Sequence, residues 1–165
     1  MNGRGIKMRV IVISDTHRDF FHLREIVEKH REEAALFLHL GDGEREMEDL
    51  LALYPDLPYK YVRGNCDLAS LAPIEDVASV GGVNIFMTHG HHYNVKYTMD
   101  DLLRAARERN CTIALYGHTH VKVTKYQDGI YIMNPGSPSE PRDGRASYGI
   151  IDIVPGGIMT FTVDL

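Results

Sequence analysis

Five short segments of the chain carry side chains that could bind a metal ion, and each follows a run of apolar residues. The segments are Ser14-Asp15-Thr16-His17, Gly41-Asp42, Gly64-Asn65-Cys66-Asp67, Thr88-His89-Gly90-His91 and Gly117-His118-Thr119-His120. Together they supply oxygen and imidazole donors that fit two divalent cations better than one structural zinc ion. Two cations that share a bridging carboxylate are typical of enzymes that hydrolyse phosphate esters. The sequence therefore predicts a dinuclear metal centre and a hydrolytic reaction.

Composition and charge limit the classes of protein to which the chain can belong. Its 165 residues suit a single domain over 1–165, and contents of 44% hydrophobic and 25% charged residues are ordinary for a soluble globular protein. The formal net charge of −5 argues against a broad nucleic-acid surface. No run approaches the ~18 apolar residues of a membrane span, so no membrane association is predicted. Residues 1–7 are polar and are interpreted as a disordered or start-site extension.

The cysteine content bears on the expected compartment. Cys66 and Cys111 are the two cysteines of the sequence, and Cys66 lies within one of the five segments. The simplest interpretation is two reduced thiols in a cytosolic protein rather than a disulfide scaffold. We therefore expect a cytoplasmic protein.

Strands and helices alternate in the first half of the sequence. The apolar pattern predicts three strands and two helices, over residues 8–14, 36–40 and 59–63 and over 20–31 and 44–54 respectively. Asp19 is the expected N-cap of the first helix, and Pro55 ends the second. This order of elements favours parallel strands joined by right-handed crossovers.

The second half of the sequence changes mostly to antiparallel hairpins. Gly81-Gly82 separates strands predicted over 77–80 and 83–88, which indicates a hairpin. Thr98 is the expected N-cap of a helix that extends to about residue 110, with Asp101 in the capping-box position. Further strands are predicted over residues 112–116, 121–126, 130–133, 148–153 and 159–163. The whole pattern predicts one α/β domain with two packed sheets.

Each of the five segments follows one of the predicted strands. Proteins of the α/β class gather their sites beyond the carboxyl ends of the strands, so we expect these side chains to converge. Glycines such as Gly41 and Gly117 permit the tight turns that bring short side chains to a shared centre. One Asp-x-His or His-x-His pair alone would carry little weight, whereas five segments at predicted strand ends are difficult to obtain by chance.

The order of these segments resembles the motifs of the calcineurin-like metallophosphoesterase superfamily. The motifs are Asp-x-His, Gly-Asp, Gly-Asn-x-Asp, His-Gly-His and Gly-His-Thr-His, and the resemblance extends through the Asn134-Pro135-Gly136-Ser137 turn to about Arg142. It is close to the small YfcE-like phosphodiesterase branch of that superfamily. The fold that it implies is a two-sheet β-sandwich flanked by helices, a four-layer α/β/β/α arrangement.

The resemblance also implies which side chains bind the metal ions. One ion would be bound by Asp15, His17 and His120, the second by Asn65, His89 and His118, and Asp42 would bridge the two. Mn²⁺ is the first choice for both ions, with Fe, Zn or Ni as alternatives, because this set of ligands does not select among them. Two bridged cations lower the pKa of a water molecule between them, and the resulting hydroxide would attack phosphorus.

Four residues are expected to take part in catalysis, namely Asp42, Asn65, Cys66 and His91. Many members of the superfamily have His at the position of Cys66, where it contacts phosphate or assists the leaving group. A thiol is a poorer proton donor than imidazole, so we expect Cys66 mainly to shape the pocket. His91 or the adjacent His92 could contact substrate or, alternatively, support the ligands by hydrogen bonds.

Other polar residues near the motifs receive mostly structural interpretations. Glu44 is expected to begin a helix rather than to bind metal. Arg142 could clamp a phosphate or, equally, form a surface salt bridge. His22, His30 and His39 are expected to be structural, and His39, close before the Gly-Asp motif, could lie behind the ligands.

Three functions remain open from the sequence. The leading one is a metal-dependent phosphodiesterase that hydrolyses a small diester. A phosphomonoesterase or nucleotidase is second, because the same pair of metals serves either substrate. The third is a non-catalytic scaffold like the retromer subunit built on this fold, which the retention of all seven ligand positions disfavours. The expected partner is a small phosphate ester, and the oligomeric state is open, with a homodimer as one alternative.

Overall fold

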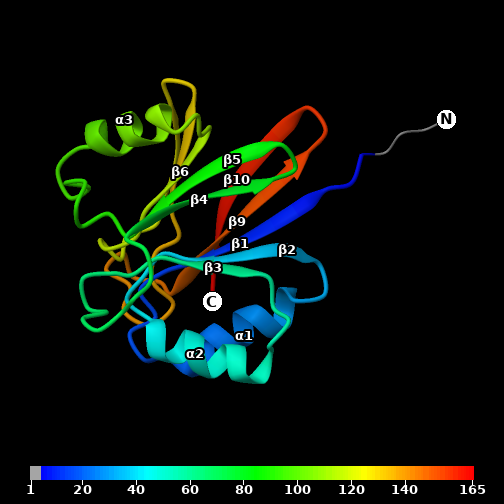
Figure 1. The fold of residues 1–165 in the computed structure, drawn as a ribbon, viewed down its shortest axis with the longest axis vertical. Coiled ribbons are helices and arrows are strands. Elements are labelled where there is room, and N and C mark those ends of the chain that lie inside the picture. The colour runs from blue at the N-terminus through cyan, green and yellow to red at the C-terminus, as the bar shows by residue number, and fades with distance from the viewer. Residues whose placement is uncertain (1–4) are drawn as a thin grey trace.

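Two five-stranded sheets pack face to face in the computed structural model, which describes residues 5–165 (Figure 1). In chain order the elements are β1 (Met8–Ile13), α1 (Phe20–His30), β2 (Ala34–His39), α2 (Glu44–Leu53), β3 (Tyr59–Tyr61), β4 (Glu75–Val80), β5 (Val83–Thr88), α3 (Asp100–Glu108), β6 (Ile113–Leu115), β7 (Val123–Gln127), β8 (Ile130–Asn134), β9 (Ser147–Val154) and β10 (Gly157–Asp164). Residues 1–4 of the predicted extension lie outside the described residues, and residues 5–7 are exposed and without regular structure. Within the described part of the chain, none of the helices has the length and apolar content needed to cross a membrane.

The first sheet has the strand order β10-β9-β1-β2-β3. Strands β1, β2 and β3 are parallel, as the alternation of strands and helices predicts, and β9 and β10 complete the sheet in antiparallel pairs. Helices α1 and α2 cover its outer face (Figure 1), where Leu23 and Leu50 are buried in one cluster with Ile11. The predicted N-cap is confirmed, because Asp19 accepts a hydrogen bond from the backbone N–H of His22. The predicted start of α2 at Glu44 is confirmed as well.

The second sheet has the order β4-β5-β6-β8-β7. The predicted hairpin of β4 and β5 is present, and both glycines of its turn, Gly81 and Gly82, have positive φ angles of 56° and 79°. Strand β6 lies between β5 and β8 and is parallel to both. Helix α3 covers the outer face of this sheet and buries Leu102 and Ala106 in a cluster with Phe86.

The predicted N-cap of α3 is wrong. The helix begins at Asp100, and its N-cap residue is Met99, which makes no side-chain capping bond. The hydroxyl of Thr98 instead accepts the N–H of Asp100, the first residue of the helix, at 3.2 Å in a local turn. The Asp101 carboxylate interacts with Arg104, three residues later on the same helix, and not with a cap.

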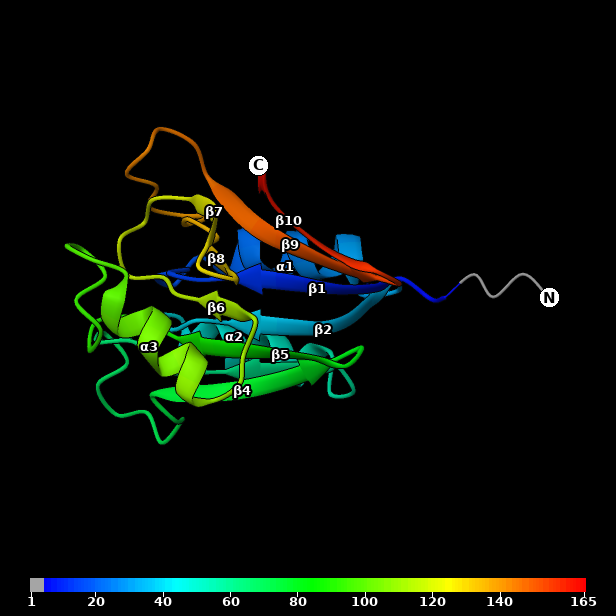
Figure 2. The same ribbon diagram turned by 90° about the horizontal axis from the view of Figure 1, so that it is seen from above.

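The space between the sheets is filled by aliphatic side chains, among them Val12, Leu38, Ile85 and Leu115, all fully buried. The four layers of the predicted α/β/β/α arrangement are therefore present, with α1 and α2 on one side and α3 on the other (Figure 2). The arrowheads of β1 and β5, which belong to different sheets, point to the same edge of the molecule (Figure 2). The loops at this edge carry the predicted ligands.

Candidate metal centre

The predicted ligands follow five strands that end at one edge of the two sheets. Asp15 and His17 follow β1, Asp42 follows β2, Asn65 follows β3, His89 follows β5, and His118 and His120 follow β6. Carboxylate, imidazole and thiol donors from these loops form three groups within residues 5–165 in which all donor atoms lie within 4.8 Å of one another. These groups contain every predicted Asp and His ligand except His118. The convergence expected from the sequence is therefore observed.

The backbone at this edge adopts a conformation that ordinary residues rarely take. The predicted ligands with positive φ angles are Asp15 at 57°, His17 at 41°, Asp42 at 59°, His118 at 68° and His120 at 58°. A left-handed conformation costs roughly 1–2 kcal/mol for a residue other than glycine, and such strain gathers at functional sites. The loops are also closely packed, since a Cβ atom at Gly64 would lie 2.0 Å from Oδ1 of Asp42.

The first group consists of Asp15, His17 and His120. Oδ2 of Asp15 accepts hydrogen bonds from the Ser14 hydroxyl at 2.6 Å and from the His118 N–H at 3.0 Å. Oδ1 is buried and has no hydrogen-bond partner among residues 5–165. Oδ1 lies 3.2 Å from Nε2 of His120 and 3.5 Å from Nε2 of His17, and the two nitrogens are 3.1 Å apart. Neighbouring donors held ~2.1 Å from one ion are themselves about 3 to 3.5 Å apart. These three side chains therefore fit a shared cation.

The Asp15 carboxyl is held in its ionised form, as a metal ligand must be. Burial alone would raise its pKa, but the nearby imidazoles of His120, His17 and His89 outweigh burial and place the pKa well below the usual range.

Asp42 lies between the group of Asp15, His17 and His120 and the side chains predicted to bind the second ion, Asn65, His89 and His118. Its Oδ2 is 3.3 Å from Nε2 of His89 and 3.8 Å from Nε2 of His17, and its Oδ1 accepts the N–H of Cys66 at 2.8 Å. Nε2 of His89 is also 3.0 Å from the amide oxygen Oδ1 of Asn65. A carboxylate between two groups of donors has the position that a bridging ligand requires.

His118 lies beside the second group through its ring. The centroid of its imidazole is 5.2 Å from that of His89. Burial and the neighbouring His89 and Lys96 lower the pKa of His118, so its ring is kept neutral, as metal binding requires.

Two of the imidazoles are oriented by backbone carbonyls. Nδ1 of His89 lies 2.7 Å from the carbonyl oxygen of Leu40, and Nδ1 of His120 lies 2.7 Å from that of Glu140. A carbonyl oxygen only accepts, so both Nδ1 atoms carry a hydrogen. Both Nε2 atoms, which hold the lone pair when the ring is neutral, lie toward the centre. This arrangement is typical of histidines that bind metal.

Two networks behind the centre contain residues to which sequence reasoning assigned no role. Both oxygens of Asp67 accept backbone N–H groups of the two neighbouring loops, and Tyr61 donates its hydroxyl to Oδ2 at 2.5 Å. The position of Asp67 in the Gly-Asn-Cys-Asp segment was the available signal. In the second network, the buried Thr16 hydroxyl donates to Oε1 of Glu46 at 2.5 Å and lies 3.0 Å from Nε2 of His39. His39 thus lies behind the ligands, which is one of the two positions that the sequence allowed for it.

The remaining candidates differ in how far they are enclosed. Cys66 is largely exposed, and the pKa of its thiol is raised first by partial burial and then by the charge of the nearby Asp42. His91 packs against His89, and its Nδ1 is buried with no hydrogen-bond partner in the described part of the chain. Burial together with the neighbouring His92 lowers the pKa of His91 to about 4. Arg142 is exposed, and its side chain forms none of the ion pairs found among residues 5–165.

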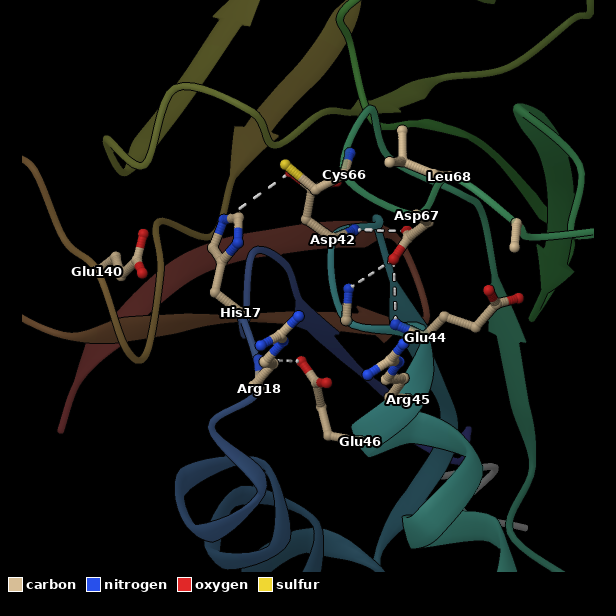
Figure 3. A pocket seen from close by; sticks show the side chains of 12 residues that line it. His17, Arg18, Asp42, Glu44, Arg45, Glu46, Cys66, Asp67, Leu68 and Glu140 are labelled. Atoms are coloured by element: carbon tan, nitrogen blue, oxygen red, sulfur yellow. Dashed lines mark hydrogen bonds and ion pairs between the residues drawn. The ribbon is translucent and has the colours of Figure 1, made fainter.

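A cavity of about 520 Å³ opens next to the centre (Figure 3). Its inner end is formed by His17, Asp42 and Cys66. A molecule in this cavity would therefore lie beside His17 and the predicted bridging ligand Asp42.

Comparison with known proteins decides the family. The model of the calcineurin-like phosphoesterase superfamily domain matches residues 8–156, nearly the whole chain. The chain belongs to this superfamily. The probable metallophosphoesterase YsnB of Bacillus subtilis is 34% identical over 148 residues, which cover 88% of this chain and 85% of YsnB. Phosphodiesterase YfcE of Escherichia coli is 35% identical over 101 residues, 55% of this chain and 50% of YfcE.

Solved structures of other proteins share the fold described above. A conserved protein of Streptococcus pneumoniae, described as a predicted phosphoesterase, matches with a TM-score of 0.81 and 28% identity over 96% of this chain and 99% of that one. Vacuolar protein sorting 29 of Cryptosporidium parvum matches with a TM-score of 0.77 and 18% identity over 98% and 99% of the two chains, a likeness in fold alone. The predicted family and fold are thus confirmed, and the family supports a hydrolase.

Proposed function

We propose that this chain is a dinuclear metal-dependent phosphodiesterase that hydrolyses small phosphate diesters. The observation that carries the proposal is the position of Asp42, whose Oδ2 lies 3.3 Å from His89 and 3.8 Å from His17 and so joins two groups of metal-binding donors. The unpartnered Oδ1 of the buried Asp15 supports it, because a buried carboxylate oxygen without a donor is costly unless a cation is bound. The names of the relatives YsnB and YfcE agree with this class of reaction.

The residues of the site would have the following roles in metal binding and catalysis. Asp15, His17 and His120 would hold one cation, Asn65, His89 and His118 the other, and Asp42 both. When bound, the two cations would supply Lewis acidity toward the phosphoryl oxygens and lower the pKa of a water molecule at the site. Leu40 and Glu140 fix the ring orientation of two ligands through their carbonyl groups. Cys66 lines the cavity and would mainly shape the space for the substrate. His91 packs against His89 and would either support that ligand or contact the substrate.

We propose Mn²⁺ as the first choice of metal. We also propose that the protein is cytoplasmic. The donors are carboxylate, amide and imidazole groups, which suit Mn²⁺ and also Fe, Zn or Ni. The free thiols of Cys66 and Cys111 agree with a reducing compartment.

A non-catalytic role is less well supported. The likeness to vacuolar protein sorting 29 rests on fold at 18% identity. Here seven competent ligands are present, and five of them have strained backbone conformations that a scaffold would not need.

The test is a panel of substrates with protein that has been stripped by a chelator and then loaded with Mn²⁺. We expect hydrolysis of an aryl phosphodiester to disappear on stripping and to return on loading, with a lower rate for the matching monoester. Metal analysis should find about two ions per chain. Less than about one bound ion after loading, or a rate that does not depend on metal, would contradict the proposal.

A further inference from the structure

The cavity beside the metal centre extends well beyond the predicted ligands. Its outer wall is formed by the loop after β1, the first turn of α2 and the loop after β3, through Arg18, Arg45, Leu68 and Ala69. Figure 3 shows Arg18 and Arg45 projecting from the same side of the cavity, with Glu140 beyond His17 at the other end. The space has room for a substituent of the substrate next to the reacting phosphate.

Most acidic side chains of the cavity wall are already bound to the protein itself. Asp67 accepts hydrogen bonds from four backbone N–H groups and from the Tyr61 hydroxyl. Glu46 accepts from the Thr16 hydroxyl and from the backbone N–H of Arg18 at 2.9 Å. These carboxylates are held toward the loops they support, so their charges are partly offset by donors of the protein.

Arg18 and Arg45, the two arginines of the cavity wall, differ from these carboxylates in their contacts with the protein. Neither the Arg18 nor the Arg45 guanidinium takes part in a hydrogen bond or ion pair found within residues 5–165, and both residues are exposed. Elsewhere in the same part of the chain, exposed arginines do engage carboxylates, as Arg24 does with Glu28 at 2.8 Å. The cavity therefore contains two planar donors that remain available to a ligand.

The backbone of Arg18 gives independent support for a functional role. Its φ angle is 71°, a conformation that residues with side chains rarely adopt, and Glu46 holds it through the Arg18 N–H. Because Arg18 directly follows His17, this conformation places the guanidinium at the cavity next to a predicted metal ligand.

From this placement we infer that the substrate is a phosphodiester with a second phosphate on one ester arm, and that Arg18 and Arg45 bind this second phosphate. A guanidinium matches two phosphate oxygens with parallel N–H donors, a pairing stronger than that of neutral groups. The inference rests on the proposed phosphodiesterase function and adds the chemical class of the substrate to it.

The experiment compares two nitrophenyl diesters that differ in one group. These are thymidine 5′-(p-nitrophenyl phosphate) and the same compound with an additional 3′-phosphate. With the Mn²⁺-loaded protein we expect kcat/KM to be about tenfold higher for the compound with the second phosphate, mainly through KM. In the double variant Arg18→Gln, Arg45→Gln this ratio should fall to about one, while the matched surface variant Arg104→Gln keeps it.

Two results would overturn the inference, namely a ratio near one in the wild type or a ratio that survives in the double variant. If the wild type hydrolyses neither compound, the proposed function itself has failed, and the phosphate site is then judged by binding alone. For that purpose thymidine 3′,5′-bisphosphate and thymidine 5′-monophosphate are titrated calorimetrically into chelated protein. Tighter binding of the bisphosphate that the double variant abolishes supports the site, and equal binding rejects it.

Discussion

The backbone N–H of Asp42 donates a hydrogen bond of 2.8 Å to Oδ2 of Asp67. The N–H of Gly64 donates to the same oxygen at 2.8 Å, and the N–H groups of Gly43 and Glu44 donate to Oδ1. One carboxylate therefore connects the loop after β2, the start of α2 and the loop after β3. The position of the bridging carboxylate of Asp42 depends on a residue that is not itself a predicted ligand.

Replacing this carboxylate should loosen the centre. In Asp67→Asn one acceptor oxygen becomes an NH₂ group that faces backbone N–H donors, so we expect a loss of about 2 kcal/mol of unfolding free energy and weaker metal binding. Urea unfolding of the chelated protein and metal titration measure the two effects. The control is Asp76→Asn, a half-exposed carboxylate paired with Lys60. Equal stability of the two variants would show that the Asp67 contacts contribute little.

Changes at the predicted ligands should separate the bridging residue from a terminal one. Asp42→Ala removes the donor that joins both groups, whereas Asn65→Ala removes one donor of the second group, next to His89. We expect the Asp42 variant to retain less metal than the Asn65 variant, as measured by elemental analysis after loading. Wild-type metal content in the Asp42 variant would refute the bridging assignment, and His22→Ala serves as the control with unchanged content.

Cys66 should affect the geometry of the pocket more than proton transfer. Its thiol is exposed at the inner end of the cavity, and beside two bound cations it would tend to ionise and could not donate a proton. For Cys66→Ala we expect a loss in kcat of less than about tenfold that depends little on the leaving group. Rates for a series of diesters with leaving groups of increasing pKa test this. A selective collapse for the poorest leaving groups would instead identify Cys66 as the general acid.

The stability of the chelated protein should decrease on acidification because of His39. Burial lowers the pKa of His39 to about 4 from its ordinary 6.5. Above pH 6.5 the ring is neutral in both states and its contribution is complete; between pH 6.5 and 4 only the unfolded chain takes up the proton, so stability is lost as the pH falls. The full effect is about 3 kcal/mol. Urea unfolding at several pH values should give a smaller slope for His39→Gln than for wild type, and equal slopes for the two proteins would contradict this account.

Local sequence patterns were sufficient to predict most helices and strands and to predict that the ligands lie close together. The apolar run before Asp15, the N-cap Asp19 and the Gly81-Gly82 turn each act within a few residues, so they can be recognised without knowledge of the fold. The start of α3 was misplaced because the Thr98 hydroxyl has two local uses, as a cap or in a turn, and the sequence alone does not decide between them.

The supporting networks could not be predicted because their partners are distant in sequence. Thr16 and Glu46 are 30 residues apart, and Asp42 and Asp67 are 25 apart. Such contacts depend on β1, β2 and β3 being neighbours in one sheet, and a motif does not reveal which of its residues face away from the ligands. The motif marks Asp67 as a candidate, but its contacts with the backbone of the neighbouring loops follow only from the fold.

The predicted ligands come from both sheets, with Asp15 and Asp42 after strands of the first and His89 and His120 after strands of the second. Cations held between them would cross-link the two halves of the sandwich at one edge, where the aliphatic core no longer reaches. Their loss would leave that edge to separate while the rest of the sandwich stays closed, which exposes its loops to proteases first. The lifetime of such a protein in a cell would then follow the supply of its metal, so that chains without metal are removed before they accumulate.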